Sequence, residues 1–248
     1  MDLALCVLAL VARRDGKTDA PEHVTAAEIH GELVARGFLT TAQASEVSAL
    51  RDLAGSEGLS EEEFVWFFLM LISAGNESTR TVTSHGMRLL MENPDQLQYL
   101  VDNPDKIGNA CEEMLRYNTA FISMRRTAME DTLLGGQHIK QGDKVLLHYH
   151  TINMDESVFG DDAMDFDVTR PERMPDLYNQ LRSFGIGQHF CIGSHLARLE
   201  LRIMFEEIIP RLRNPQFAAP PRYVRSFFVN AMKEMRITFD PEQGSQAA

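Results

Sequence analysis

The feature that most constrains the fold is a glycine-rich run near the C-terminus that contains one cysteine. Residues 183–193 read SFGIGQHFCIG, and Cys191 stands just before Gly193. The strongly helical sequence that follows predicts a helix over residues 194–209, ended by Pro210. A cysteine at the start of a helix lies near the positive end of the dipole and near unpaired N–H groups, which stabilise a thiolate. The run therefore predicts a sulfur ligand for a soft metal centre.

Two other interpretations of this run are open. A lone cysteine is most often a small buried hydrophobe, and a cluster of glycines is most often a turn. A zinc site formed by His189, Cys191 and His195 would have too few ligands at unsuitable spacing. We favour the soft-metal interpretation because the sequence around the cysteine supplies a matching context.

Five spaced positions of the run resemble the haem-ligand loop of the cytochrome P450 family: Phe184, Gly187, His189, Cys191 and Gly193. The resemblance implies that Cys191 binds the iron of haem b, where a thiolate donates electron density that favours O–O cleavage. It also implies that Phe184 shields the sulfur and that His189 hydrogen-bonds a haem propionate. Gly187 and Gly193 would let the backbone approach the macrocycle, which a Cβ would hinder.

A long helix is predicted upstream of this loop. Ser60 is followed three residues later by Glu63, which is the pattern of a capping box. Apolar residues then recur at helical spacing from Phe64 to Val82, and we expect the helix to end at Met91, before an Asn-Pro pair.

This helix carries a second motif of the same family. Ala74 and Gly75 offer small side chains against which a flat cofactor or O₂ would lie, while Glu77 and Ser78 supply an acid and an alcohol. The resemblance implies that Glu77 and Ser78 relay protons to the oxygen site. Many relatives have threonine in place of Ser78, and serine is less restrained about χ1. We expect either looser proton delivery with more uncoupled peroxide, or a role shared with Thr79.

A third element of the resemblance is a pair of charged residues one helical turn apart, Glu113 and Arg116. In the family a further arginine locks such a pair beneath the haem loop as a structural brace. Arg170 is the first candidate for this arginine and Arg173 is the second. The run 170–184, which contains two prolines, is expected to be a surface excursion.

Two short runs, 133–136 and 145–149, are predicted to be strands of a small sheet. They follow Arg125 and Arg126. By resemblance Arg126 pairs with a haem propionate, a bidentate contact that suits a guanidinium group. Arg125 is an alternative for this contact, and a solvated strand charge is the simpler interpretation.

The predicted substrate is an apolar, lipid-like small molecule, because the walls of the expected pocket are apolar. These walls are Phe67, Leu71 and Ala74, with the runs 120–124 and 227–229. Sequence near the C-terminus is also similar to bacterial steroid and branched-lipid hydroxylases.

The expected electron donor is a ferredoxin or flavodoxin type of protein that delivers electrons from NAD(P)H. Four arginines near the helix that follows the cysteine would receive an acidic ferredoxin, or they would form a solvated helical face. They are Arg198, Arg202, Arg211 and Arg213.

Composition limits the remaining possibilities. With 248 residues and 44% hydrophobic composition the chain can bury a core, and its net charge of −12 argues against nonspecific nucleic-acid binding. Cys6, Cys111 and Cys191 show no paired spacing, so no disulfide framework is indicated. The apolar run 3–12 is too short to span a bilayer and follows Asp2 instead of basic residues. We expect a cytoplasmic protein without a membrane span.

The predicted fold class is mainly α with small β-sheets, corresponding to the C-terminal portion of the P450 fold and truncated on its N-terminal side. Residues 1–59 are expected to form a helical segment without an assigned role, and residues 60–248 are expected to form the haem-binding part. The predicted function is a monooxygenase that inserts one oxygen atom from O₂ into its substrate. The alternatives are a haem-binding or haem-free remnant without this activity, and a peroxide-driven haem enzyme.

Overall fold

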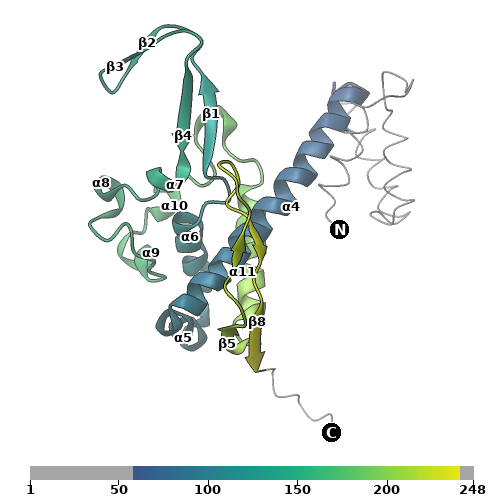
Figure 1. Ribbon diagram of the computed structural model, residues 1–248, viewed down its shortest axis with the longest axis vertical. Helices are drawn as coiled ribbons and strands as arrows, with labels where there is room; N and C mark the ends of the chain where they lie inside the picture. The colour runs from purple at the N-terminus through teal and green to yellow at the C-terminus, as the bar shows by residue number, and fades with distance from the viewer. Residues whose placement is uncertain (1–57, 241–248) are drawn as a thin grey trace. The chain divides into compact units, whose positions relative to one another are not determined.

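The computed structural model describes residues 58–240 (Figure 1). The chain divides into two compact units, Met1–Asn76 and Glu77–Ala248, each of which is described by itself. Almost all of the N-terminal segment predicted for residues 1–59 lies outside the described residues. The division predicted after residue 59 stays a prediction.

The long helix α4 runs from Glu61 to Glu92, with its first half in the first unit. Its start is the predicted capping box: the Ser60 N–H donates to Glu63 Oε2 at 2.9 Å, and the Glu63 N–H donates to Ser60 Oγ at 3.3 Å. At its end, the side-chain amide of Asn93 donates to the Leu89 carbonyl at 2.8 Å. The predicted helix is confirmed and ends one residue later than expected.

The second unit is mainly helical. Its helices after α4 are α5 (Pro94–Asp102), η2 (Pro104–Lys106), α6 (Ile107–Tyr117), α7 (Tyr149–Ile152), α8 (Glu156–Phe159), α9 (Arg170–Arg173), α10 (Leu177–Gln180), η3 (Gly187–His189) and α11 (Ser194–Ile208). The helix predicted after the cysteine is thus α11, and its start matches the expected residue.

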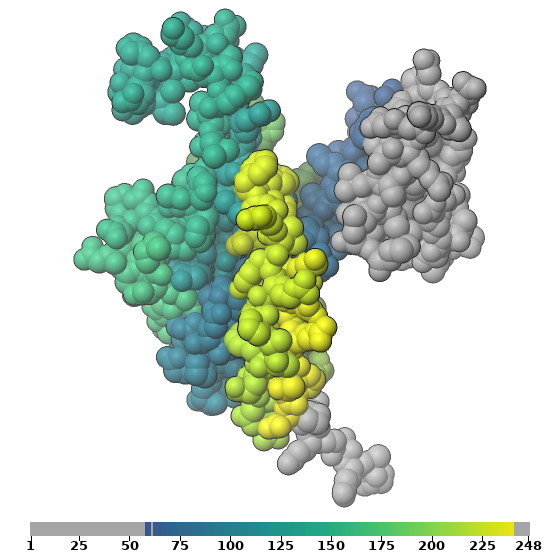
Figure 2. All heavy atoms as spheres, in the orientation of Figure 1, coloured from purple at the N-terminus to yellow at the C-terminus, as the bar shows by residue number. Residues whose placement is uncertain are grey.

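The strands of the described region form four antiparallel two-stranded ladders. The pairs are β1 (Ser123–Thr127) with β4 (Lys144–His148), β2 (Thr132–Leu134) with β3 (Gln137–Ile139), β5 (Arg213–Phe217) with β8 (Ile237–Asp240), and β6 (Arg222–Tyr223) with β7 (Met232–Glu234). Figures 1 and 2 show the β1–β4 ladder projecting from the helices of this unit, with the β2–β3 hairpin at its far end.

Two local predictions need correction. The strands predicted at 133–136 and 145–149 do not pair with each other, since β2 pairs with β3 and β4 pairs with β1. Gly135 and Gly136 have φ of 56° and 81° and form the turn between β2 and β3. The run 170–184 is not simply a surface excursion, because Leu177 and Leu181 are buried.

The main core of the second unit lies among the C-terminal half of α4, α6 and α11, and includes Leu90, Met114, Leu201 and Phe205. Gly86 on α4 allows this close packing. A Cβ at Gly86 would lie 2.7 Å from both Met114 Sδ and Phe205 Cζ, a distance at which the neighbours would have to move.

Candidate cofactor site

The cysteine loop is folded back on itself by backbone hydrogen bonds. The Cys191 N–H donates to the Phe184 carbonyl at 3.0 Å, and the Phe190 N–H donates to the Gly187 carbonyl at 3.0 Å. Gly187 has φ of 74°, in the left-handed region that favours glycine. Gly193 is the N-cap residue of α11, so Cys191 lies just before the helix, as predicted.

The surroundings of Cys191 fit a flat apolar group with a soft metal. Ile186, Phe190 and Ile192 are 66%, 47% and 77% exposed, so the loop presents apolar side chains beside its partly exposed thiol. A Cβ at Gly187 would have no atom within 4 Å, which leaves open space above the backbone there. A single thiolate with an apolar surround is the donor set that a haem iron with a cysteine axial ligand requires.

The other described cysteine does not compete with Cys191. Cys111 lies within α6 in the buried core, and burial raises the pKa of its thiol to about 12. Within residues 58–240 no group of three His, Cys, Asp or Glu side chains is placed to hold a metal ion. His189 is exposed at the end of η3, and its contact with a propionate stays a prediction.

Phe184 packs beneath the loop and meets a residue whose role the sequence did not reveal. Its ring centroid lies 6.4 Å from that of Phe190, and the guanidinium carbon of Arg198 lies 4.5 Å from the Phe184 centroid. The same guanidinium carbon lies 3.9 Å from the ring centroid of Tyr178. Arg198 also donates to both carboxylate oxygens of Glu112, at 2.7 and 3.1 Å.

These contacts change the expectation for the four arginines proposed to receive an electron donor. Arg198 is largely buried and already paired, so it does not belong to a solvated face. Arg202 and Arg211 are exposed and form ion pairs with Glu206 and Glu207 on the same helical stretch. Arg213 is exposed in β5.

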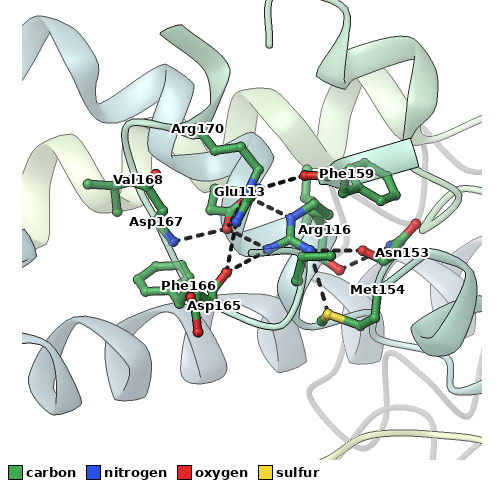
Figure 3. A network of polar contacts seen from close by, with 12 residues as sticks. Glu113, Arg116, Asn153, Met154, Phe159, Asp165, Phe166, Asp167, Val168 and Arg170 are labelled. Atoms are coloured by element: carbon green, nitrogen blue, oxygen red, sulfur yellow. Dashed lines mark hydrogen bonds and ion pairs between the residues drawn. The ribbon is translucent and has the colours of Figure 1, made fainter. Parts of the chain in front are cut away.

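The predicted brace is present and wholly buried (Figure 3). Arg116 donates from Nε and Nη2 to the two carboxylate oxygens of Glu113, each at 2.7 Å, and Arg170 Nε donates to Glu113 at 3.2 Å. Arg173, the second candidate, instead pairs with Asp162 and Asp167 at the surface. The structure thus confirms Arg170 as the third member.

Backbone carbonyls, together with the Asp162 carboxylate, satisfy the remaining donors of the brace. Arg116 Nη1 donates to the carbonyls of Asn153 and Ala163 at 2.8 and 2.7 Å. Arg170 Nη2 donates to the carbonyl of Asp162 at 2.7 Å, and Nη1 to that of Phe159 at 3.1 Å. Such complete pairing is what buried charges need to be tolerated.

Asn153 links this brace to the start of the cysteine loop, a role that sequence reasoning missed. Its side-chain amide donates to the Arg116 carbonyl at 3.1 Å and to Ser183 Oγ at 2.8 Å, while its Oδ1 accepts from the Arg182 N–H at 2.7 Å. Ser183 Oγ in turn donates to the Leu115 carbonyl at 2.5 Å. The entry to the loop is therefore fixed to the C-terminal turn of α6.

The predicted proton-relay residues lie on consecutive positions of α4 in the second unit. Glu77 Oε2 accepts a hydrogen bond from Arg80 Nη2 at 2.6 Å, an ion pair one turn apart. The Thr79 carbonyl accepts from Thr83 Oγ1 at 2.9 Å. Ala74 and Gly75 belong to the first unit. The catalytic roles of Glu77, Ser78 and Thr79 stay predictions.

Arg126 lies on β1, opposite Val145 of β4, and its side chain is exposed. Its Nη1 donates to the Arg125 carbonyl at 3.1 Å. The exposed guanidinium group is accessible to a further hydrogen-bond acceptor. The propionate contact of Arg126 or Arg125 stays a prediction.

Comparison with known proteins agrees with this geometry. A model of the family described as Cytochrome P450 matches residues 36–215. Linalool 8-monooxygenase of Pseudomonas putida is 41% identical over 180 residues, which cover 73% of this chain and 43% of that protein. Steroid C26-monooxygenase of Rhodococcus jostii (strain RHA1) is 38% identical over 194 residues, covering 78% of this chain and 39% of that protein.

A solved structure extends the comparison to the fold. The crystal structure of P450BioI in complex with hexadec-9Z-enoic acid ligated acyl carrier protein matches with a TM-score of 0.72 and 34% identity, over 87% of this chain and 53% of that one. The chain belongs to the cytochrome P450 family, which is a family of haem-thiolate monooxygenases. The predicted family is confirmed, and so is the mainly helical fold with small sheets, which matches about half of a P450 chain.

The chain spans less than half the length of these two curated relatives. The family match begins at residue 36, within the segment 1–59 for which the sequence offered no motif. In the described range 58–240, no helix has both the length and the apolar composition needed to cross a membrane.

Proposed function

We propose that this chain supplies the haem-binding part of a P450 monooxygenase, with Cys191 as the protein ligand to iron. The observation that carries the proposal is the cysteine loop, which combines a partly exposed thiol, exposed apolar side chains and a rigid connection through Asn153 to the buried brace. Gly187 and Gly193 allow close approach of the ring, Phe184 shields the sulfur, and His189 and Arg126 hold the propionates. When bound, haem supplies activation of O₂ and insertion of one oxygen atom into a C–H bond.

The residues of α4 would handle protons. In this proposal Glu77 takes a proton from solvent and passes it to the Ser78 hydroxyl, with Thr79 as a second hydroxyl nearby. Because the Glu77 carboxylate is paired with Arg80 in this structure, the relay requires that Arg80 move away when Glu77 is protonated. Electrons would come from NAD(P)H through a ferredoxin or flavodoxin type donor. The cytoplasmic location stays a prediction.

The proposed substrate is an apolar, lipid-like small molecule. Linalool and steroids are named in the relatives' activities, and a fatty acyl carrier protein is bound in the P450BioI structure. The exposed apolar side chains of Phe227 and Phe228 support the same class of substrate from this chain's own residues.

A second candidate is a haem-binding chain without monooxygenase activity. The ion pair between Glu77 and Arg80 favours it, because the carboxylate that would pass a proton to Ser78 already contacts the Arg80 guanidinium group.

Product formation separates the two candidates. Haem-loaded chain is supplied with NAD(P)H, a ferredoxin with its reductase, O₂ and an apolar terpene or steroid, and hydroxylated product is measured. We expect product, and we expect Ser78→Thr to raise the ratio of product to peroxide. A chain that holds haem but gives product neither with reductase nor with added peroxide would be a passive binder, and the monooxygenase proposal would fail. Turnover with peroxide alone would identify a peroxide-driven enzyme.

A further inference from the structure

We propose that Arg198 is a positioning residue for the cysteine loop: Glu112 holds its guanidinium group against Phe184, and Phe184 fixes the backbone of Cys191. The inference rests on the proposed function, because it assigns to Arg198 the task of holding the haem-ligand loop in shape. No sequence motif singled out Arg198 or Glu112 for this role.

The contact between Arg198 and Glu112 is bidentate and largely buried. Nε and Nη2 of Arg198 donate to Oε1 and Oε2 of Glu112 at 2.7 and 3.1 Å, and the two side chains are 11% and 16% exposed. A bidentate pair of this kind fixes the plane of the guanidinium group as well as its position. Glu112 lies on α6, next to Glu113 of the brace, so the arginine is anchored to the helix that carries two members of the brace.

The guanidinium group then contacts two aromatic rings. Its carbon lies 3.9 Å from the centroid of Tyr178 and 4.5 Å from that of Phe184. The third nitrogen, Nη1, is buried and makes no hydrogen bond to any described residue. The guanidinium group is therefore held by its two hydrogen bonds to Glu112 and by its contacts with the rings of Tyr178 and Phe184. A planar, delocalised cation suits this combination of fork and stack, and the ammonium group of lysine does not.

Phe184 connects this stack to the cysteine. Its carbonyl accepts the Cys191 N–H at 3.0 Å, so a shift of the Phe184 backbone moves the residue that carries the sulfur. Arg198 lies on α11, which begins just after the loop. The loop is therefore held at both ends, through Asn153 and Ser183 at its start and through Arg198 at the helix that leaves it.

Amide hydrogen exchange at Cys191 measures this role in the full chain without haem. Arg198→Lys keeps the charge but loses the fork and the stack, and we expect the Cys191 amide to exchange about tenfold faster. The Asn118 amide, which donates to the Met114 carbonyl at 3.0 Å, is the internal reference. Its exchange rate should change by less than about twofold. Arg202→Lys is the matched control, since Arg202 lies one turn on in α11 and its ion pair with Glu206 is exposed.

Glu112→Gln tests the anchor separately. We expect it to raise the exchange rate of the Cys191 amide as well. In the double variant Glu112→Gln/Arg198→Lys this rate should be no higher than in Arg198→Lys alone, because both substitutions act through one contact. Equal acceleration at Cys191 and Asn118 would show only a general loss of stability and would overturn the proposal. So would an Arg198→Lys chain that matches the Arg202→Lys control.

A spectroscopic readout extends the test to the haem-loaded chain. In the reduced, CO-bound state we expect Arg198→Lys to show a larger fraction of haem without thiolate ligation than the Arg202→Lys control. Wild-type chain that takes up no haem would refute the proposed function but would leave the exchange result standing, so the two failures are distinguishable.

Discussion

The brace and the cysteine loop lie in the same unit and differ in which side chains they bury and which they expose. The brace buries three charged side chains, Glu113, Arg116 and Arg170, with no exposed area at all. The loop leaves large apolar side chains, Ile186 and Ile192, mostly exposed. Charged residues are almost never fully buried unless paired, and exposed apolar clusters mark binding sites. The difference teaches that the brace satisfies its buried charges with its own contacts, whereas the loop leaves apolar surface uncovered, as binding sites do.

The largest expected effect comes from breaking the brace. Arg170→Met leaves the Glu113 carboxylate buried with one cation fewer, and we expect the free energy of unfolding to fall by about 3–5 kcal/mol. Chemical denaturation of the haem-free chain measures this change.

Arg173→Met is the matched control, because Arg173 lies one turn away and its side chain is 45% exposed. We expect a loss below about 1 kcal/mol, because both of its ion pairs, with Asp162 and Asp167, lie at the surface. Equal losses for the two variants would mean that burial of the brace does not set its contribution.

The packing of α4 against α6 and α11 should be the next most sensitive. Gly86→Ala pushes a methyl group against Met114 and Phe205, so we expect a loss of about 1–3 kcal/mol in unfolding free energy. Gly108→Ala is the comparison, since its Cβ would lie 3.5 Å from Arg202 Cδ, an ordinary contact. Thermal unfolding of the two variants should differ clearly; similar melting temperatures would refute the close packing at Gly86.

A loop substitution should affect binding and leave stability alone. Ile192→Gln replaces a side chain that is 77% exposed, so we expect the unfolding free energy of the haem-free chain to change by less than about 0.5 kcal/mol. Haem affinity should fall by about tenfold, because the apolar area would no longer be covered as favourably. Spectroscopic haem titration checks this, and an unchanged affinity would place the ring away from Ile192.

The smallest effect concerns pH. Desolvation lowers the pKa of His85, with Arg88 acting in the same direction, while the hydrogen bond to the Asn230 carbonyl and Glu92 oppose it. Nε2 contacts that carbonyl at 2.7 Å and Nδ1 is buried without a partner within the described residues, so a second proton has no acceptor there. The folded-state pKa is below the unfolded one, so the contribution is complete above pH about 6.5 and is lost as the pH falls through the folded value.

His85→Gln should therefore flatten the decline of unfolding free energy as the pH falls below about 6.5. Denaturant titrations at several pH values compare the slopes of the two chains. Parallel curves would show that His85 does not titrate with unfolding.

Much of this arrangement is predictable from sequence where the signals are local. The capping box at Ser60, the long helix and the helix after Cys191 follow from neighbouring residues, and all three are confirmed. Arg170 was also identified correctly, through its place in the family's order of motifs.

What the sequence did not reveal depends on contacts between distant segments. Asn153 looks like an ordinary loop residue, and its importance comes from partners 30 and 37 positions away. Arg198 has the pattern of a solvated helix charge, yet Glu112, 86 positions earlier, draws it into the interior. The pairing of β2 with β3 is the exception, because it is local: Gly135 and Gly136 form the turn between the two strands.

The central claim is that the loop presents Cys191 as a thiolate ligand to haem. The most direct test is the spectrum of the reduced, CO-bound chain after loading with haem, recorded in parallel for Cys191→Ala and for Cys111→Ala. We predict the Soret band of thiolate-ligated haem for the wild type and for Cys111→Ala, and its loss for Cys191→Ala. A wild-type chain that takes up haem without this band, or a Cys191→Ala chain that keeps it, would contradict the account.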